Sequence, residues 1–477
     1  MHEPTALKFQ ENAHVALADA NLQKALAGMD DTFVAYRARA VANLPEFEAL
    51  RDAAKAVKDH ALANLDFYLE RFADKVEAGG GQVHWCADAE AARAAVLEIC
   101  RRAGARTVTK GKTMIGEEIA INDHLQAHGI EPVETDLGEY IIQLRNETPS
   151  HIIAPAIHLT VEQVGETFRE AHRDLDPKRP LVDPGDMLVE ARAKLRRRFL
   201  AADVGITGAN FLIAETGTTV IVTNEGNGDL TQILPRVHIV IASIEKVVPT
   251  LADASTILRV LARSASGQEM SVYTTFSTGP RRPGDLDGPV EFHVVLLDNG
   301  RSALLGTEFE AMLRCIRCGA CLDHCPVYQK VGGHAYGWIY SGPMGAVLTP
   351  GLIGIEKSAP LPGASTFCGR CESVCPMRIP LPQMMRHWRE REFERHLTPP
   401  RYRAGLAFWG FLARRPRLYR LGTGLAGRLL AAFGRRRGAF RSLPLAKGWT
   451  AHRDMPAPEG PGFHQLWAAR RKMSPET

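Results

Sequence analysis

The residues CIRCGACLDHCP, 315–326, set the structure that this part of the chain must adopt. Their cysteines follow the spacing C-x2-C-x2-C-x3-C-P, in which one short loop presents three thiolates to the corners of an iron–sulfur cube. Tetrahedral zinc typically takes pairs of cysteines from two separate loops, so three thiolates within seven residues favour an iron–sulfur cluster. Pro326 turns the fourth thiolate, that of Cys325, away from the other three, so we expect Cys325 to serve a second cluster.

A second cysteine run, STFCGRCESVCP at residues 365–376, repeats the last three cysteine positions of the first run. Its cysteines are Cys368, Cys371 and Cys375, and Ser365 stands where a first cysteine would be. Interleaving the two runs as in a two-cluster ferredoxin allocates all of these cysteines. Cluster one takes Cys315, Cys318, Cys321 and Cys375, and cluster two takes Cys325, Cys368 and Cys371.

The second cluster is one thiolate short. We therefore expect either a [4Fe–4S] cluster with a fourth ligand other than cysteine or a [3Fe–4S] cluster. Ser365 could supply an oxygen ligand, and the alternative is that Ser365 only begins the loop. The nearest histidines, His324 and His334, are interpreted as surface or packing residues rather than ligands. Two adjacent clusters with interleaved ligands predict a carrier of single electrons.

The overall charge hides an uneven distribution. The 477 residues carry 58 Lys and Arg against 54 Asp and Glu, a net charge of +4. Fourteen of the basic residues and no acidic residue fall between Arg395 and Arg453, which leaves 44 basic against 54 acidic residues elsewhere, a charge of −10. With 45% hydrophobic residues the composition is globular, so an acidic folded body is expected to carry a basic tail.

Cysteine usage and the N-terminal sequence indicate the cellular compartment in which the protein is expected. Nine cysteines are too few for a disulfide scaffold, and the isolated Cys86 and Cys100 are interpreted as buried small hydrophobic residues. No apolar run follows a basic region at the N-terminus, and no uninterrupted apolar stretch of about 18 residues occurs. We therefore expect a cytoplasmic protein whose clustered thiols bind metal.

The predicted fold class is α/β, with four segments along the chain. Residues 1–75 are rich in Ala and Leu at helical spacing, and residues 76–300 alternate apolar runs with helical patterns, which is typical of a largely parallel sheet. Residues 301–397 predict a mainly α, ferredoxin-like module, and residues 398–477 form the basic extension. Strands are expected at 106–110, 132–136, 151–156, 208–223, 237–243, 271–277 and 291–298, and helices at 87–103, 113–129, 159–172 and 186–202.

Two motifs of the α/β domain could receive an anionic small molecule. In AETGTT, residues 214–219, the backbone around Gly217 and the threonine hydroxyls could bind a carboxylate or phosphate, and Glu215 could orient a hydroxyl. The alternative is a glycine turn with solvated threonines. Lys110 and Lys112 could supply positive charge to a small organic acid, and the alternative is a solvated lysine pair.

No dinucleotide fingerprint and no phosphate-binding G-x-x-x-x-G-K-[ST] motif is present. The sequence therefore offers no visible site for NAD, flavin or ATP. We do not expect a complete dehydrogenase in this one polypeptide. A two-electron oxidation would need another subunit.

The basic tail combines arginines with aromatic and aliphatic residues over 401–441. Three interpretations compete: an amphipathic helix on a membrane surface, a nucleic-acid patch, and a docking segment for an acidic partner. Arginines interrupt each apolar run, so the tail is not expected to span a bilayer, and Gly422, Gly424 and Gly427 weaken a single continuous helix. Docking to an acidic partner or a membrane surface is favoured over nucleic acid.

Taken together, these motifs resemble the lactate utilization protein B family. The Cys runs alone are generic, and their combination with HAYGW (334–338) and AETGTT is specific. The resemblance covers nearly the whole chain. It is carried by TKGKTMIGEEIAIN (109–122), GANFLIAETGTTVIVTNEGN (208–227), CIRCGACLDHCPVY (315–328), GGHAYGWIYSGPMGAVLTP (332–350), STFCGRCESVCPMRIPLP (365–382) and FWGFLARRPRLYRL (408–421).

The resemblance implies a cytoplasmic iron–sulfur subunit of a three-protein complex that oxidises L-lactate to pyruvate, relaying electrons through two clusters held by seven cysteines. It implies two partners, a cysteine-rich subunit similar to heterodisulfide reductase and a second subunit with a lactate-utilisation domain. It also implies an α/β fold similar to the sugar-phosphate isomerase and CoA-transferase group. The basic tail leaves peripheral attachment at the inner face of the membrane open.

Two other functions remain open at this stage. One is an electron-transfer subunit of another organic-acid or glycerol-phosphate dehydrogenase. The other is a small-molecule transferase or isomerase whose clusters are structural or regulatory. In the first reading the chain is a non-autonomous subunit of an oxidoreductase, and in the second it is itself an enzyme.

Overall fold

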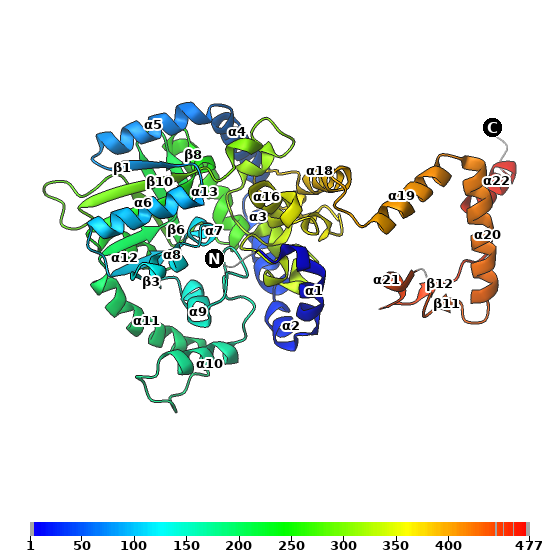
Figure 1. Ribbon diagram of the computed structural model, residues 1–477, viewed down its shortest axis with the longest axis horizontal. Coiled ribbons are helices and arrows are strands. Elements are labelled where there is room, and N and C mark those ends of the chain that lie inside the picture. Colours follow the sequence, from blue (N-terminus) through cyan, green and yellow to red (C-terminus); the bar gives the residue numbers. More distant parts are fainter. Residues whose placement is uncertain (1–3, 444–445, 452, 461, 474–477) are drawn as a thin grey trace. The chain divides into compact units, whose positions relative to one another are not determined.

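The computed structural model describes residues 4–443, 446–451, 453–460 and 462–473. The chain divides into two compact units, Met1–Glu392 and Phe393–Thr477. The first unit contains the N-terminal helices, both larger sheets and all nine cysteines, and the second contains the basic extension (Figure 1). The predicted α/β class is confirmed, and the division into four segments stays a prediction.

The main sheet has six strands, all parallel, in the order β1-β10-β7-β4-β2-β3. Apolar and β-branched residues fill its central strands, as expected for a parallel sheet covered on both faces. After β2 the chain adds β3 on one side and returns to place β4 on the other, so the strand order reverses between β2 and β4. The strands are β1 (Gln82–Cys86), β2 (Thr107–Gly111), β3 (Glu131–Glu134), β4 (Val204–Thr207), β7 (Val237–Ser243) and β10 (Glu291–Leu297).

Strand β7 shows how the two faces are filled. Val237, Ile239 and Ile241 pack with helices α6 (Ala89–Arg102), α7 (Met114–Glu118) and α8 (Ile121–Ala127). Val240 and Ala242 point to the opposite face and pack with helix α5 (Leu65–Ala78). This alternation follows from the two-residue period of a strand, and it buries both faces of the sheet.

A smaller mixed sheet has the order β8-β5-β6-β9. The predicted turn at Gly217 joins the antiparallel strands β5 and β6. Gly217 has φ +69°, and a Cβ there would lie 2.6 Å from the backbone nitrogen of Val76, so the turn needs glycine on both counts. The strands are β5 (Phe211–Ile213), β6 (Thr218–Thr223), β8 (Val247–Val248) and β9 (Tyr273–Ser277).

Several predicted elements differ from the structure. The predicted helix 113–129 is two helices, because Ala120 adopts a left-handed conformation between α7 and α8. The strand predicted at 151–156 is wrong: this segment is a buried loop in which the ring of His151 accepts the N–H of Ala154 at 3.2 Å. Its apolar residues pack on the cysteine module rather than in a sheet. Not predicted were β1, β4, β8 and the helices α9 (Leu137–Arg145), α12 (Asn227–Ile233) and α13 (Leu251–Ala265).

The connections on the β3 side are helical, as predicted. Helix α10 spans Val161–Ala171 and begins with a capping box formed by Thr160 and Gln163. Helix α11 spans Pro184–Ala201 and follows the N-cap Asp183. Both helices pack with α9 in one apolar cluster that covers the β3 edge.

The N-terminal segment is helical, as predicted, and it packs on the cysteine module. Helices α1 (Phe9–Ala18) and α2 (Ala20–Leu26) contact the helix α15 (Tyr328–Val331) of that module. Helix α4 (Phe47–Ala63) contacts α13 and the 3₁₀ turn Glu310–Arg314. Helix α3 (Ala35–Ala42) completes the segment. These residues therefore share one continuous apolar core with the cysteine runs.

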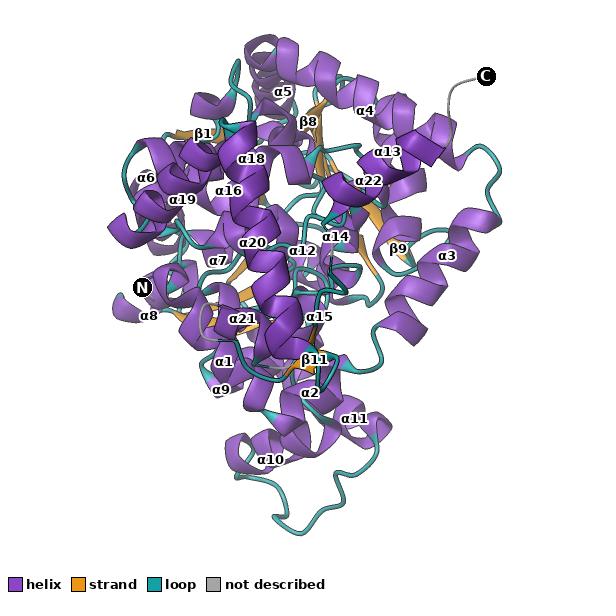
Figure 2. Cartoon of the chain, turned by 90° about the vertical axis from the view of Figure 1, so that its right-hand side faces the viewer, coloured by secondary structure: helices purple, strands orange, loops and turns teal. Residues whose placement is uncertain are grey.

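The cysteine module is mainly helical, as predicted (Figure 2). Trp388 anchors it, because its ring stacks on Phe309 with centroids 4.0 Å apart and its Nε1 donates to the carbonyl oxygen of Val347 at 2.9 Å. Stacking of this kind adds about 1 kcal/mol to the burial of the rings. The helices are α14 (Ala320–Asp323), α15, α16 (Gly342–Ile353), α17 (Arg370–Ser373) and α18 (Leu381–Glu394).

In the extension, helix α20 (Pro416–Gly434) runs through Gly422, Gly424 and Gly427. These glycines were expected to weaken a single continuous helix, and α20 accommodates them because each costs only about 1 kcal/mol relative to alanine. The extension is still not a single helix, because residues 414–415 separate α20 from the helix before it. Among the described residues, no helix combines the length and the hydropathy needed to cross a membrane. The other elements are α19 (Pro400–Ala413), β11 (Ala439–Phe440), α21 (Lys447–Thr450), β12 (Met455–Pro456) and α22 (Phe463–Met473).

Candidate functional site

The two cysteine runs have the same local structure. After Cys318, Gly319 has φ +76° and begins α14, and after Cys368, Gly369 has φ +81° and begins α17. Glycine reaches this left-handed region without a steric penalty, so each C-G-x-C turns sharply from loop into helix. The next cysteine of each run then lies within that short helix. Helices α14 and α17 also contact each other, which brings the two runs side by side.

Four cysteines drawn from both runs line one cavity, and we call them the first cysteine group: Cys315, Cys318, Cys321 and Cys375. Burial raises the pKa of Cys321 well above its ordinary value, and the other three thiols of the group and Cys371 raise it further. Cys375 belongs to the second run, and the structure places it with three cysteines of the first. This is the arrangement that the interleaved allocation requires.

The remaining thiols form the second cysteine group, Cys325, Cys368 and Cys371. Burial raises the pKa of Cys371 to about 12, and Cys325 and Cys368 raise it as well. Cys325 comes from the first run and lies with two cysteines of the second. Cys325 and Cys371 are buried, whereas Cys368 is exposed. The isolated Cys86 and Cys100 are buried free thiols, as predicted.

Ser365 and the neighbouring histidines have local partners. The Ser365 hydroxyl accepts the N–H of Phe367 at 3.0 Å, so it shapes the loop before Cys368. The Nδ1 of buried His324 lies 2.9 Å from a backbone carbonyl oxygen of α14. The Nε2 of His334 lies 2.7 Å from another backbone carbonyl oxygen. These contacts are those of loop and packing residues.

The donor set fits iron–sulfur clusters. In the part of the chain that the structure describes, no three His, Cys, Asp or Glu side chains are arranged to hold a single metal ion. The thiolates of a cluster bind different iron atoms, so they need not converge on one point. Burial raises the pKa of Cys375 to about 11, and a nearby cation such as iron would reverse that effect.

A buried tyrosine also fits a cluster beside the second cysteine group. Tyr336 is fully buried, and its hydroxyl has no hydrogen-bond partner among the described residues. Burial raises the pKa of Tyr336 well above its ordinary value, and Cys325 is the next largest cause. A buried hydroxyl without a partner costs about 1–3 kcal/mol. A cluster sulfide or thiolate would supply the missing acceptor.

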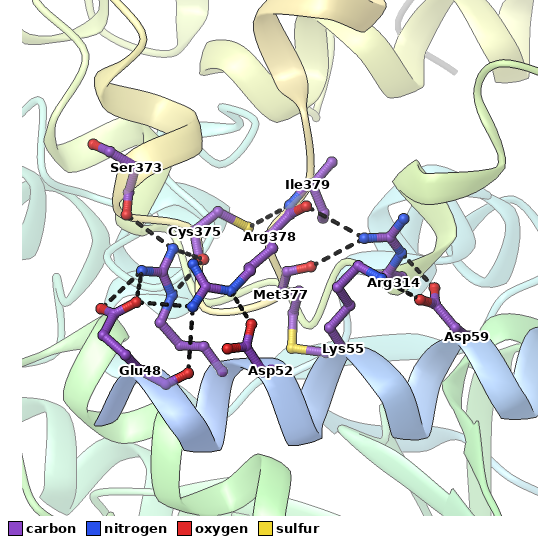
Figure 3. A network of polar contacts seen from close by, with 11 residues as sticks. Glu48, Asp52, Lys55, Asp59, Arg314, Ser373, Cys375, Met377, Arg378 and Ile379 are labelled. Carbon is purple, nitrogen blue, oxygen red and sulfur yellow. Dashed lines mark hydrogen bonds and ion pairs between the residues drawn. The ribbon is translucent and has the colours of Figure 1, made fainter. Parts of the chain in front are cut away.

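Helix α4 holds the second run against the first. Arg51 is buried, and its Nη2 donates to the carbonyl oxygens of Ser373 and Cys375 at 2.9 and 2.7 Å. Arg314 forms an ion pair with Asp59 of α4 at 2.7 Å. Figure 3 shows these contacts along α4, together with Arg378, which pairs with two carboxylates of the same helix. The guanidinium groups also place positive charge close to the first cysteine group.

A buried ionic network connects the module to the α/β domain. The Arg301 guanidinium binds Glu118 with Nη2 and Oε2 2.6 Å apart, and Tyr340 donates to the same carboxylate at 2.6 Å. Arg301 and Arg317 both pair with Glu245, at 3.1 and 3.3 Å. Arg317 lies within the first cysteine run, so this network fixes that run to the end of strand β7.

Two lysines join this network. The buried Lys58 donates to the backbone carbonyl oxygens of Glu245 and Val247. Lys246 is 6% exposed and has no hydrogen-bond or ion-pair partner among residues 4–443 and the other described stretches. Burial lowers the pKa of Lys246 to about 8. The region therefore holds four cations against two carboxylates: Lys58, Lys246, Arg301 and Arg317 against Glu118 and Glu245.

Beside this network lies a cavity of about 310 Å³. Its wall on the sheet side comes from residues that follow β2, β3, β4 and β7, and its opposite wall includes Arg317 and Cys318. The cavity thus opens between the carboxyl ends of the parallel strands and the first cysteine group. The residues that line it include Lys112, Asp136, Glu139, Gly208, Lys246, Ala265, Arg317 and Cys318.

The two motifs predicted to receive an anion have different environments. Lys110 is fully buried between Glu117 and Glu134, with both carboxylates 2.7 Å from its Nζ, so the expected solvated lysine pair is wrong. Lys112 pairs with Asp136 and lines the cavity. The AETGTT motif forms a turn, as the glycine-turn interpretation predicts, and it is not part of the cavity wall.

The threonines and the glutamate of that turn have structural partners. Thr218 and Thr219 are buried rather than solvated. Glu215 accepts the N–H of Leu251 at 3.2 Å, which caps the start of α13. The functional candidates that the sequence did not reveal are Lys246 and Arg317. Their only signals were a lysine after the apolar run 237–243 and an arginine inside a cysteine run.

This fold and its paired cysteine groups define an iron–sulfur protein in which a dicluster module is joined to an α/β domain. Residues 69–297 match the LUD domain, residues 311–379 the 4Fe-4S dicluster domain, and residues 372–472 the family described as lactate utilisation protein B, C-terminal. The chain belongs to the lactate utilization protein B family, which confirms the resemblance found in the motifs.

Three relatives illustrate the extent of the match. The chain is 40% identical to lactate utilization protein B of Bacillus licheniformis over 98% of its own length and 97% of the relative. It is 41% identical to the protein of that name from Shouchella clausii, over 97% of each chain. It is 40% identical, over 95% of each chain, to a protein of Escherichia coli described as an uncharacterized electron transport protein.

Proposed function

We propose that this protein is the iron–sulfur electron-transfer subunit of a multi-protein complex that oxidises L-lactate to pyruvate. The observation that carries the proposal is the interleaving of the two cysteine groups, in which Cys375 and Cys325 have exchanged runs. Such an exchange holds two clusters next to each other, as a relay of single electrons needs. The names of the relatives support lactate as the source of the electrons.

In this proposal the first cysteine group holds one cluster and the second cysteine group holds the other. When bound, the clusters supply one-electron transfer at a potential set by their ligands and surroundings. The second cluster is either a [4Fe–4S] cluster with a ligand other than cysteine or a [3Fe–4S] cluster. The engagement of the Ser365 hydroxyl by Phe367 supports a role for Ser365 in the loop.

The chain's own residues tune the first cluster. The backbone N–H of Ile379 lies 3.5 Å from the Cys375 sulfur and donates to it. Arg37 and Arg51 act on the Cys318 and Cys375 thiolates as nearby positive charges. Hydrogen bonds and cations both stabilise added negative charge, so they favour the reduced state of a cluster at this position.

The oxidation itself needs a partner. L-lactate releases two electrons and two protons on conversion to pyruvate, whereas each cluster takes one electron. We therefore assign the two-electron step to the complex, with a cysteine-rich subunit similar to heterodisulfide reductase and a second subunit carrying a lactate-utilisation domain as the proposed partners. This chain is then a non-autonomous part of an oxidoreductase.

The basic extension is proposed to dock this subunit to an acidic partner or to an anionic membrane surface. Leu418, Leu421, Leu425, Leu429 and Phe433 are exposed and recur every three or four residues along α20, so they share one helix face. Full-length protein carrying Leu425→Glu should sediment less with anionic vesicles than the native chain. Equal sedimentation of the two would rule out the membrane as the docking surface.

Spectroscopy of the assembled complex tests the proposed function. The purified chain is mixed anaerobically with its two partner proteins, and cluster reduction is followed by EPR on addition of L-lactate. We expect reduction with L-lactate only when the partners are present. Reduction by glycerol phosphate or another organic acid in place of L-lactate would assign the subunit to a different dehydrogenase. Clusters that stay oxidised with every donor would favour a transferase or isomerase with structural clusters.

A further inference from the structure

The cavity lies where an α/β sheet places its ligands. The strand order reverses between β2 and β4, and the cavity is lined by Lys112, which follows β2, and by Gly208, which follows β4. In open α/β sheets, ligands bind outside the carboxyl ends of the strands at such a reversal. A Cβ on Gly208 would lie 2.5 Å from the carbonyl oxygen of Lys112, so the two loops meet closely there.

Where the cavity wall follows β2 and β3, its lysine is already paired. Lys112 binds Asp136 and also lies 3.5 Å from Glu225. Burial raises the pKa of Glu139 well above its ordinary value, and Glu134 and Asp136 raise it further. The backbone N–H of Lys112 donates to Glu139 at 3.0 Å, which holds this side chain in the wall. This part of the wall therefore offers shape and polarity but no free positive charge.

Where the wall follows β7 and meets the first cysteine run, the charge is net positive. Lys246 lines the cavity, is 6% exposed and has no partner within the described stretches of the chain. Arg317 lines the same wall, and its one carboxylate partner, Glu245, is shared with Arg301. Glu245 and Cys315 act on Lys246 only through space, and a buried ammonium group without a hydrogen-bonded or ion-paired partner is costly, so its presence in a cavity wall indicates an anionic ligand.

We propose that this cavity binds a small carboxylate, a 2-hydroxy or 2-oxo acid, through Lys246 with Arg317 as the second cation. The inference rests on the proposed function and extends it, because it locates a substrate or product site on this subunit. About 310 Å³ is at the lower end of the range for ligand pockets, about 300–1,000 Å³, which suits a small acid rather than a dinucleotide.

The position of the cavity gives this binding a consequence. Cys318 lines the cavity and also belongs to the first cysteine group. Arg317 and Cys318 line both this cavity and that of the first cysteine group, so an acid bound by Lys246 would lie close to the first cluster. Its negative charge would bear directly on that cluster, so binding should shift the EPR spectrum or the potential of the first cluster more than that of the second.

Calorimetry on the full-length chain carrying both clusters tests the proposal. L-lactate and pyruvate are the two titrants, and the variants are Lys246→Gln, Lys246→Arg and the exposed control Lys357→Gln. We expect binding to weaken by about tenfold or more in Lys246→Gln, because the variant loses a charge-assisted contact at a largely buried ammonium group. Lys246→Arg should keep most of the affinity, and Lys357→Gln should bind like the native chain.

A second pair of variants removes space instead of charge. Ala265 lines the cavity near the end of α13, and Ala252 lies exposed near the start of the same helix. Ala265→Leu should weaken binding of both acids, whereas Ala252→Leu should not change it. Equal iron content in all variants shows that each has folded and loaded its clusters.

The outcomes separate this inference from the proposed function. If the native chain fails to bind either acid, or if Lys246→Gln and Ala265→Leu bind as well as the native chain, the inference is overturned. Clusters reduced by L-lactate in the assembled complex would then leave the proposed function standing. Conversely, binding that depends on Lys246 in a complex that L-lactate cannot reduce would support the cavity and overturn the function. Displacement of both acids by equal concentrations of chloride would overturn the specificity for small acids.

Discussion

The first cysteine group lies inside the unit, whereas the second reaches its surface through the exposed Cys368. Around the first group the chain gathers Arg37, Arg51 and Arg317, and it encloses the group between helix α4 and the α/β domain. The second group has three thiols and the unpartnered hydroxyl of Tyr336. Two cluster sites with the same cysteine spacing thus have unlike surroundings.

The difference between the surroundings of the two cysteine groups shows how electron transfer between two clusters can be given a direction. Nearby cations stabilise an added electron, burial alone disfavours it, and exposure shortens the distance to a partner's cofactor. In the proposed function, electrons enter at the first cluster, next to the cavity, and leave from the second. The comparison can be tested by variants that act on one group and spare the other.

The largest effect is expected from removing Cys375 or Cys325, the two cysteines that each lie with the cysteines of the other run. Cys375→Ala should abolish the signal of the first cluster although residue 375 lies in the second run, and Cys325→Ala should abolish that of the second. EPR and iron analysis of anaerobic protein measure both signals. Cys100→Ala, at an isolated buried cysteine, is the control and should keep both. If Cys325→Ala and Cys315→Ala remove the same signal, the interleaved allocation is wrong.

A smaller effect is expected when the hydrogen bonds from Arg51 of α4 to the second cysteine run are removed. Arg51→Met leaves the carbonyl oxygens of Ser373 and Cys375 without their donor, which should lower the free energy of unfolding by about 3 kcal/mol. Denaturant unfolding measures this, and the first cluster should be lost at lower denaturant than the second. Arg71→Met, at an exposed position of α5, is the matched control. Simultaneous loss of both clusters would show that Arg51 does not stabilise the first cysteine group specifically.

The smallest effect concerns Tyr336. Tyr336→Phe removes a hydroxyl that we expect to donate to the second cluster, so that cluster's potential should fall by about 20–60 mV. Redox titration followed by EPR gives both potentials, and that of the first cluster should not change. Tyr328→Phe is the control, because the Tyr328 hydroxyl already donates to the carbonyl oxygen of Ser150 at 2.8 Å. An unchanged second potential in Tyr336→Phe would show that the hydroxyl does not face the cluster.

The sequence predicted the parts of the molecule whose chemistry is local. The cysteine runs, the glycine turn at Gly217 and the parallel sheet follow from spacing and apolar patterns within short windows. The Lys246 cavity could not be predicted, because it depends on which strand ends meet and on the absence of a carboxylate near one ammonium group. The solvated pair expected at Lys110 failed for the same reason, since Glu134 approaches from a neighbouring strand.

Helix α4 was predicted as a helix, but its role was not. Its apolar face could have packed on any partner, and nothing in the first 75 residues refers to a cysteine run. The bounds of α20 were also not predicted: its glycines were expected to weaken a continuous helix, and α20 runs through them. For α4, long-range packing decided the role.

The contact between Arg51 and Cys375 has a consequence for how the protein is made. The two residues are 324 positions apart, and synthesis proceeds from the N-terminus. Helix α4 is therefore synthesised long before the second cysteine run, and Arg51 has no partner there until nearly the whole of the first unit has been synthesised. Because Cys375 joins the first group only then, all four thiolates of that group are available for iron only after residue 375 has been synthesised. Loading of the first cluster therefore follows most of the synthesis of the first unit.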